Sequence, residues 1–577
     1  MDRSPRSRAK TFIFATVFWL LLLLVPLLAL EAIVRAIGWQ APIDPYVHFG
    51  RTVSFFEDVK IDGVDSKQVK ARELYREREV SFATRKPPDT FRIFCIGSSA
   101  SAGWPHPDTE IYSAYLAQAL ASAYPSREIE VINVSAHAYA AYRNRLILQE
   151  VLQFEPDLLI VYTGNNEFIE PRLYATAARW YEPLESLAKH STVYRLIRGS
   201  SGVAKLFPGN TFRSDLRGNV AFEQWSKIDK LPLVLRTDPG QFEKVVQHYD
   251  FSVTSMARAA QEKGTPVILL TVPVNLRTWQ PNVSVVSVQG EQEKAWRKEY
   301  SAGRAALLRS EAELAAAALA RAAAIDSGHA ATQYYLGRAL ETAGRLDEAY
   351  GAFERARDLD ASPFRATSHL NNVVRRIGGS FGNVTMIDME AVFRDAVHPY
   401  APGFDLFLDY VHPTKKGNLL IAQKVFDAIS ASGRLGPAGA PFRHVPAAQD
   451  DGTEYDATKD QDLQRILFML AMMMHQNETV VALGERIVAN PGGIDALGEQ
   501  RAHIVVTALE LFREVVKLER RELLEGEVPQ TEKDKLASRL ADFFRTTFGN
   551  YQEYLEQRKR SPGHLPIRPP ATTTGAR

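Results

Sequence analysis

Four short motifs follow runs of β-forming residues, and three of them supply a hydroxyl, an amide, and a carboxylate with an imidazole. Ser99 follows the run 91–96, and Asn166 lies in a Gly-Asn-Asn-Glu motif. Asp409 precedes His412 by three positions in an Asp-x-x-His-Pro motif. A serine can attack a carbonyl carbon while a histidine takes its proton, and an aspartate can orient that histidine. The motifs therefore predict acyl transfer with Ser99, Asp409 and His412 as the catalytic residues.

The same chemistry needs donors for the oxyanion that forms on the substrate. We expect the amide of Asn166 and the backbone N–H groups of Ser99 and Ala138 to supply them. Each motif also has a plainer interpretation, since a serine-rich turn can cap a helix and Gly-Asn-Asn-Glu makes a good turn. His106 and His137 are expected to be ordinary loop histidines. The fixed order of the motifs, each at or after a predicted strand end, is what favours a site.

The elements that position these residues alternate between strand and helix patterns. Five runs predict buried strands: 91–96, 129–134, 157–163, 266–272 and 383–388. The clearest helical patterns between them cover 110–123, 141–154 and 241–263. This alternation predicts an α/β fold, a flavodoxin-like three-layer sandwich with a five-stranded parallel sheet. The carboxyl ends of such strands are where sites form.

The four motifs resemble the blocks of the SGNH (GDSL-like) hydrolase family. Gly97-Ser98-Ser99 is similar to the Gly-Asp-Ser block, 164–167 matches the Asn block, and 409–413 matches the His block. Ala138 aligns with the oxyanion glycine of the remaining block. The resemblance implies a five-stranded α/β sandwich, the SGNH hydrolase fold, that hydrolyses esters, often acetyl or lipid esters and sometimes carbohydrate acetyl groups.

This resemblance covers 89–290 and 376–432, and it departs from the family pattern at two positions. Ser98 stands where the family has aspartate, and Ala138 where it has glycine. Neither change removes a predicted catalytic residue, and an alanine still offers its N–H. We therefore expect activity to survive.

Three further polar residues are expected near the site. Asn275 and Arg277 follow the fourth predicted strand, and Arg365 follows the segment that interrupts the sheet pattern. We expect them at a substrate rim, where an arginine could bind an anionic group. A structural salt bridge is the alternative for each arginine.

The N-terminus carries a basic segment, 1–10, followed by a charge-free run from 11 to 30. About twenty apolar residues span a bilayer core, so 11–32 is predicted to be a transmembrane helix. The basic flank predicts a cytoplasmic N-terminus and an extracytoplasmic, periplasmic catalytic domain. A cleaved signal peptide is the alternative. Residues 33–88 are expected to be a juxtamembrane connector.

Residues 291–375 form a helical segment inserted between the last two strands. Its Leu336, Gly337, Ala349 and Phe353 match the spacing of a tetratricopeptide repeat, which binds protein partners. A plain helical hairpin is the alternative. The remaining predicted segments are a linker at 433–459, a helical region at 460–557 and a disordered tail at 558–577.

Composition excludes several classes of function. The 577 residues carry a formal net charge of +1, so no nucleic-acid partner is implied. The single cysteine, Cys95, excludes an intramolecular disulfide and lies inside a predicted strand. No dinucleotide-binding or P-loop motif occurs. No metal and no cofactor are predicted.

The sequence thus favours a membrane-anchored extracytoplasmic serine esterase acting on acyl esters, for instance acetyl esters of envelope glycans or lipids. An acyltransferase using the same acyl-enzyme stays open. An inactive envelope scaffold that recruits partners through its helices is the competing class, and the changes at Ser98 and Ala138 favour it. A metal-dependent hydrolase is disfavoured because Asp409-x-x-His412 has no companion ligand cluster.

Overall fold

The computed structural model of the 577-residue chain describes residues 5–36, 54–70, 79–168, 191–194, 239–443, 461–474, 476–489 and 497–560. The predicted tail at 558–577 lies largely outside the described residues, as does most of the predicted linker at 433–459.

A five-stranded parallel sheet forms the centre of the molecule, in the order β5-β4-β6-β7-β8. The strands are β4 (Thr90–Gly97), β5 (Glu128–Asn133), β6 (Leu158–Tyr162), β7 (Val267–Leu270) and β8 (Val384–Ile387). Numbered along the chain, this order is 2-1-3-4-5, the flavodoxin-like arrangement. The predicted fold class is confirmed.

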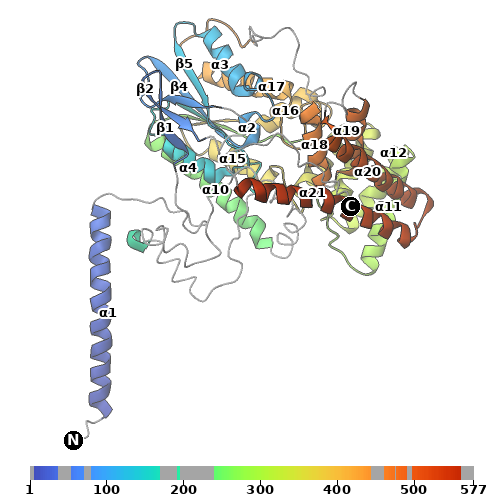
Figure 1. Cartoon of the computed structure of the whole chain (residues 1–577), viewed down its shortest axis with the longest axis horizontal. Coiled ribbons are helices and arrows are strands. Elements are labelled where there is room, and N and C mark those ends of the chain that lie inside the picture. The colour runs from blue at the N-terminus through green and yellow to red at the C-terminus, as the bar shows by residue number, and fades with distance from the viewer. Residues whose placement is uncertain are drawn as a thin grey trace, which may run out of the picture.

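Helices cover both faces of this sheet (Figure 1). Ile93 and Cys95 of β4 pack in one core, and Phe94 and Ile96 pack in the other, because successive strand side chains point to opposite faces. A strand buried on both faces has a continuous apolar sequence, which is why 91–96 could be recognised. The first core is shared with α3 (Tyr112–Ala123), α16 (Met389–Val397) and α17 (Lys415–Ala431). The second is shared with α4 (Ala141–Val151), α10 (Pro239–Glu262) and α15 (Ser368–Gly378).

A second, antiparallel sheet lies in the segment that was expected to be a connector. Its strands are β1 (Phe56–Ile61), β2 (Val64–Val69) and β3 (Ser81–Ala83). Phe82 is buried, and its ring centroid lies 5.0 Å from that of Phe94 in β4. The sequence did not indicate these strands within 33–88, because they are mostly polar and solvent-exposed and give little apolar periodicity.

The first four of the five helices between β7 and β8 form two similar hairpins. They are α11 (Glu291–Leu308), α12 (Ala312–Ile325), α13 (Ala330–Thr342) and α14 (Leu346–Asp358). A Cβ on Gly303 would lie 2.5 Å from Leu319, and one on Gly337 would lie 2.8 Å from Phe353. Each residue of the second pair is 34 positions after its counterpart, so the same close approach recurs in both hairpins.

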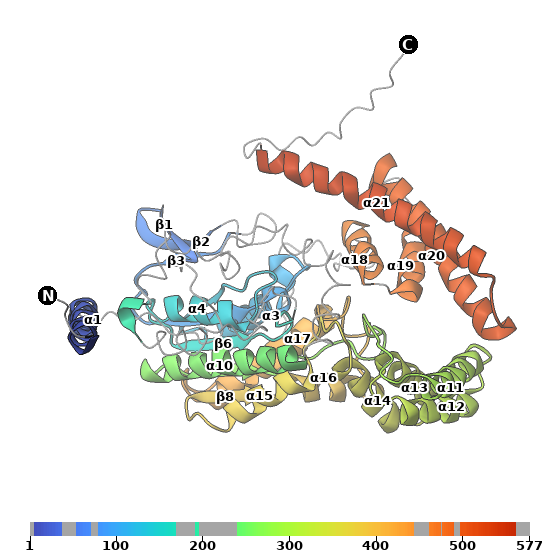
Figure 2. The same cartoon turned by 90° about the horizontal axis from the view of Figure 1, so that it is seen from below.

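The C-terminal part contains α18 (Gln461–Met473), α19 (Asn477–Ala489), α20 (Glu499–Glu525) and α21 (Gln530–Arg560). Figure 2 shows α18–α20 beside the inserted helices, and α20 contacts α11.

The predicted transmembrane helix at 11–32 falls within α1 (Pro5–Ala36). In the part of the chain that the structure describes, no helix combines the length and apolar character that crossing a membrane requires. The structure therefore gives this prediction no support.

Candidate active site

The turn after β4 carries Ser99 to the carboxyl edge of the sheet. A Cβ on Gly97 would lie 2.1 Å from the carbonyl oxygen of Tyr162 in the neighbouring strand, so only glycine fits there. Ser98 then caps the one-turn helix α2 (Ser99–Ala102), and its carbonyl accepts the N–H of Ala102 at 2.8 Å. Ser99 is only partly buried, whereas Ser98 is buried.

The Asp-x-x-His segment forms a tight loop just before α17. One carboxylate oxygen of Asp409, Oδ1, accepts the backbone N–H groups of Val411 and His412, each at 2.8 Å. The carbonyl of His412 accepts the N–H of Leu408 at 2.8 Å. Asp409 has no exposed surface. These bonds fix the loop independently of any substrate.

The structure joins the three predicted catalytic residues in one hydrogen-bonded row. Asp409 Oδ2 lies 2.6 Å from His412 Nδ1, and His412 Nε2 lies 2.8 Å from Ser99 Oγ. An ionised carboxylate only accepts, so Nδ1 carries the proton towards Asp409 and Nε2 is the acceptor that faces the hydroxyl. This arrangement can activate a serine for attack on a carbonyl carbon.

Aromatic residues border the imidazole. The ring of Trp104, which is partly exposed, has its centroid 4.4 Å from that of His412. On another side the buried Tyr410 ring lies 6.0 Å from the imidazole. Burial, and secondly the charge of Asp409, raise the pKa of the Tyr410 phenol well above its ordinary value, so this phenol stays neutral.

Two of the predicted oxyanion residues lie close together, because the Asn166 side chain on the loop after β6 reaches the loop after β5 that carries Ala138. The side-chain amide of Asn166 donates to the carbonyl of Tyr139 at 3.2 Å, which places it beside Ala138 and leaves its second N–H for another acceptor. Ala138 has a φ of 60°, in the left-handed region that favours glycine. This backbone shape gives a physical reason for aligning Ala138 with a family glycine.

Two of the predicted rim residues are not at a rim. Asn275 has no exposed surface, and its amide donates to the carbonyl of Asp409 at 2.9 Å. Arg365 is 2% exposed and donates to the carbonyls of Asn275 and Trp279 at 2.7 and 2.8 Å. Both side chains turn inward because buried backbone carbonyls need donors. Neither side chain is therefore exposed at the rim where it had been expected.

Arg277 is the one of the three that stays partly exposed. Its guanidinium lies 2.7 Å from Asp405 and 3.5 Å from Glu341, so both neighbours already balance its charge. The structural salt bridge that the sequence left open is therefore what the structure contains.

Sequence reasoning missed the residues that hold the histidine loop from the other side. His106 Nε2 lies 2.8 Å from the carbonyl oxygen of Pro413. The Asn418 amide donates to the same carbonyl at 3.3 Å and accepts the N–H of Tyr112 at 3.1 Å. The only signal was the position of His106 shortly after the nucleophile motif and of Asn418 shortly after the His motif.

Among the described residues, no group of three or more His, Cys, Asp or Glu side chains is arranged to hold a metal ion.

Comparison with family models and with curated proteins gives no match. Among solved structures, the acetylxylan esterase Axe2 from Geobacillus stearothermophilus is similar at 14% identity and a TM-score of 0.28, over 59% of this chain and 94% of Axe2. TesA is similar at 13% identity and a TM-score of 0.24, over 59% of this chain and 98% of TesA. Scores and identities this low carry no weight for function, which has to be inferred from the geometry.

Proposed function

We propose that the protein is an SGNH-type serine esterase or acylhydrolase that works through an acyl-enzyme on Ser99. The observation that carries this proposal is the row Asp409–His412–Ser99, with distances of 2.6 and 2.8 Å, ending on a partly exposed hydroxyl. The row ends on a hydroxyl that a substrate can reach, which an inactive scaffold does not need.

The reaction follows from these contacts. As Ser99 Oγ bonds to the ester carbon, its proton passes to His412 Nε2, and Asp409 stabilises the imidazolium. The negative charge moves to the former carbonyl oxygen, where the second N–H of Asn166 and the N–H groups of Ser99 and Ala138 are its proposed partners. Collapse releases the alcohol with the proton from His412. Water then attacks the acyl-serine by the same steps and releases the acid.

A small acyl group is the favoured substrate class. The partly exposed indole of Trp104 has its ring centroid 4.4 Å from that of His412, so a large ring occupies the space next to the base. An acetyl ester, on an envelope glycan or a lipid, fits this proposal. Attack by a sugar hydroxyl instead of water would make the same acyl-enzyme a transferase.

Hydrolysis of p-nitrophenyl acetate by the folded protein tests the proposal. Ser99→Ala and His412→Ala should each lower kcat by at least about 10³-fold, because each removes a member of the row. Ser380→Ala and His503→Ala are matched controls, since both side chains are exposed and distant in sequence from the motifs. Equal rates in all five proteins would favour the scaffold. Faster product release on addition of a sugar acceptor would favour the transferase.

The inserted helices are proposed to be a pair of tetratricopeptide-like repeats. Support comes from the spacing of 34 residues between Gly303 and Gly337 and between Leu319 and Phe353, since 34 is the length of that repeat. The C-terminal helix α20 already contacts α11. A separate protein partner for 291–375 stays a prediction, and pull-down with the insertion as bait, with and without α18–α21, would test it.

An extracytoplasmic location and a membrane anchor also stay predictions. They rest on the basic segment 1–10 and the uncharged run 11–30. A reporter that is active only outside the cytoplasm, fused after residue 560, would test the location. An expressed fusion that shows no reporter activity would contradict it.

A further inference from the structure

The loop that carries Asp409 and His412 is held by a buried asparagine from a distant part of the chain. Asn275 lies five residues after β7, and its amide donates to the Asp409 carbonyl at 2.9 Å. Its backbone N–H donates to the carbonyl of Tyr410 at 3.1 Å. Asn275 therefore donates hydrogen bonds to two successive carbonyl groups of the loop. The first of these carbonyls belongs to Asp409, the aspartate that orients the imidazole.

The asparagine is itself fixed from two sides. Its side-chain oxygen accepts the N–H and the hydroxyl of Thr278 at 3.0 and 2.9 Å, so the amide cannot turn over. Its own carbonyl accepts from Arg365 at 2.7 Å, and Arg365 also holds the carbonyl of Trp279. Arg365 emerges after α14, the last helix of the insertion.

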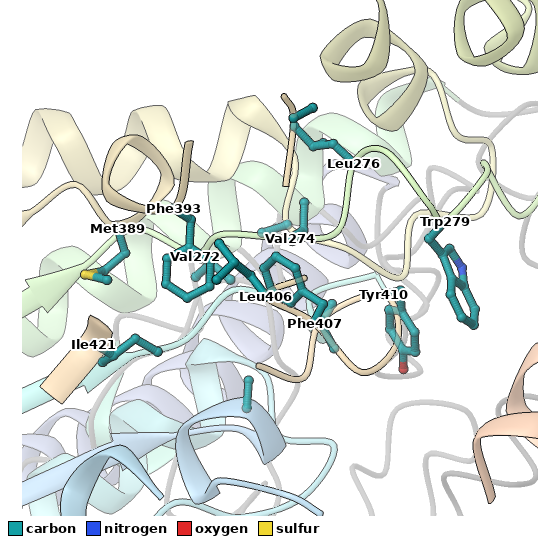
Figure 3. Close-up of a cluster of buried hydrophobic side chains, with 14 of the residues drawn as sticks. Val272, Val274, Leu276, Trp279, Met389, Phe393, Leu406, Phe407, Tyr410 and Ile421 are labelled. Carbon is teal, nitrogen blue, oxygen red and sulfur yellow. The ribbon is translucent and has the colours of Figure 1, made fainter. Parts of the chain in front are cut away.

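The surrounding packing agrees with a rigid support. Figure 3 shows Val274 close to Leu406 and Phe407, and all three belong to one buried apolar cluster. The indole of Trp279 lies 5.5 Å from the ring of Tyr410, which Figure 3 also shows. Backbone bonds from Leu276 and Arg277 to the Pro402 carbonyl, at 2.9 and 3.1 Å, complete the contact.

We propose that Asn275 is a positioning residue for the Asp409–His412 pair, with Arg365 as its anchor. The hydrogen-bonded connection runs from Arg365 through Asn275 and Asp409 to His412 and Ser99. Through it, the exit of the helical insertion fixes the geometry of the base. Neither side chain touches the substrate. The kinetic test of this positioning role rests on the proposed esterase activity, whereas the spectroscopic test below does not.

The first test replaces the donor while keeping the shape. Asn275→Asp places an oxygen against the Asp409 carbonyl, and the repulsion should displace the pair. We expect kcat for p-nitrophenyl acetate to fall about 10- to 100-fold with KM nearly unchanged, because a small misplacement of a catalytic group has that cost. Asn275→Gln, which keeps the donor on a longer arm, should recover part of the rate.

An asparagine at the opposite end of the strands provides the matched control. Asn383, which directly precedes β8, also donates to backbone carbonyls, those of Ala257 and Thr265, at 3.1 and 3.2 Å. Asn383→Asp should also lower stability and leave kcat of the folded fraction unchanged. Equal loss of kcat in the Asn275 and Asn383 variants would overturn the positioning role.

A spectroscopic test does not depend on turnover. In protein labelled with ¹⁵N-histidine, the Nδ1–H proton of His412, assigned by its loss in His412→Ala, should resonate far downfield because of the short bond to Asp409. Asn275→Asp should shift or broaden this signal, and Asn383→Asp should leave it in place. An unshifted signal in Asn275→Asp would overturn the inference. A shifted signal in a protein without esterase activity would retain it and reject the proposed function instead.

Discussion

The α/β unit and the helical unit of α11–α14 with α18–α20 both bury polar side chains, but they use them differently. In the α/β unit the buried groups converge on Ser99, which solvent can reach. In the helical unit His329, Thr332 and Trp296 bond to one another: Nδ1 of His329 lies 2.9 Å from the Thr332 hydroxyl, which accepts from the Trp296 indole at 3.2 Å. Buried polar side chains alone therefore do not identify an active site. A hydrogen-bonded row that ends on a solvent-accessible nucleophile, as at Ser99, does identify one.

The largest expected effect on activity comes from breaking the hydrogen-bonded row Asp409–His412–Ser99 in the α/β unit. Asp409→Asn keeps the shape but replaces the acceptor of the Nδ1–H proton, so the imidazole should adopt the wrong tautomer. We expect kcat to fall about 10³- to 10⁴-fold while the protein stays folded. Steady-state hydrolysis and circular dichroism would measure both.

Asp405→Asn is the control for this change, because Asp405 lies on the same loop and pairs with Arg277 instead. It should retain kcat. A similar loss of kcat in both variants would show that the Asp409–His412–Ser99 row is no more important for activity than the Asp405–Arg277 ion pair.

The next effect concerns the junction between the two units. Arg357 of α14 is 1% exposed and lies 2.6 Å from Glu390 of α16. Arg357→Met leaves Glu390 with Arg375 as its remaining partner, at 2.7 Å. The free energy of unfolding should fall by about 3 kcal/mol, the lower end for breaking a buried pair. Urea unfolding would measure this, and kcat of the folded fraction should be unchanged.

Arg321→Met provides the comparison, since Arg321 is 60% exposed and pairs with Glu299 on the surface. Its loss should cost no more than about 0.5 kcal/mol. If Arg357→Met removed activity without removing stability, the helical unit would belong to the catalytic machinery.

A third effect depends on pH. Burial lowers the pKa of His329 from 6.5 to about 4, the nearby charge of Asp326 opposing this shift. Between these values the unfolded chain binds a proton that the folded protein does not, so stability falls as pH drops from about 6.5 to 4. The full loss is on the order of 3 kcal/mol.

His329 also caps α13 by accepting the N–H of Thr332 at 3.1 Å. Asn is a good cap without a titrating group, so His329→Asn should flatten the dependence of the unfolding midpoint between pH 7 and pH 5. An unchanged slope would show that another group controls acid stability.

The smallest effect tests the strained turn beside the site. Ala138→Gly relieves the φ of 60° and should raise the free energy of unfolding by about 0.5–1 kcal/mol, because glycine adopts this region without a steric cost. The N–H group is kept, so kcat should stay within about twofold. A lower free energy of unfolding in Ala138→Gly would contradict the inference that the backbone of Ala138 is strained.

Much of the α/β unit could be predicted because its signals are local. The runs 91–96 and 157–163 are continuous apolar segments between turn residues, and they became β4 and β6. Ser99, Asp409 and His412 could be proposed because the ends of parallel strands meet at one edge. Their contact could not be measured from the sequence.

What could not be predicted depends on tertiary environment. Asn275 and Arg365 were expected to face a substrate, but whether a side chain turns outward or satisfies a buried carbonyl is decided by distant segments. The strands β1–β3 carry mostly exposed polar residues, so the sequence has no apolar periodicity there from which the strands could be predicted. The repeat of the helical hairpins, in contrast, could be recognised in part, because Gly337 and Phe353 of the second hairpin match the tetratricopeptide spacing.

Covalent trapping of the nucleophile tests the central claim most directly. The folded protein would be treated with a fluorophosphonate and examined by intact-mass and peptide-mapping spectrometry. The geometry predicts one adduct, on Ser99, that is absent in Ser99→Ala and forms far more slowly in His412→Ala. An adduct on another residue, or none on folded protein under conditions that label a known serine hydrolase, would contradict the proposal that Ser99 is an activated nucleophile.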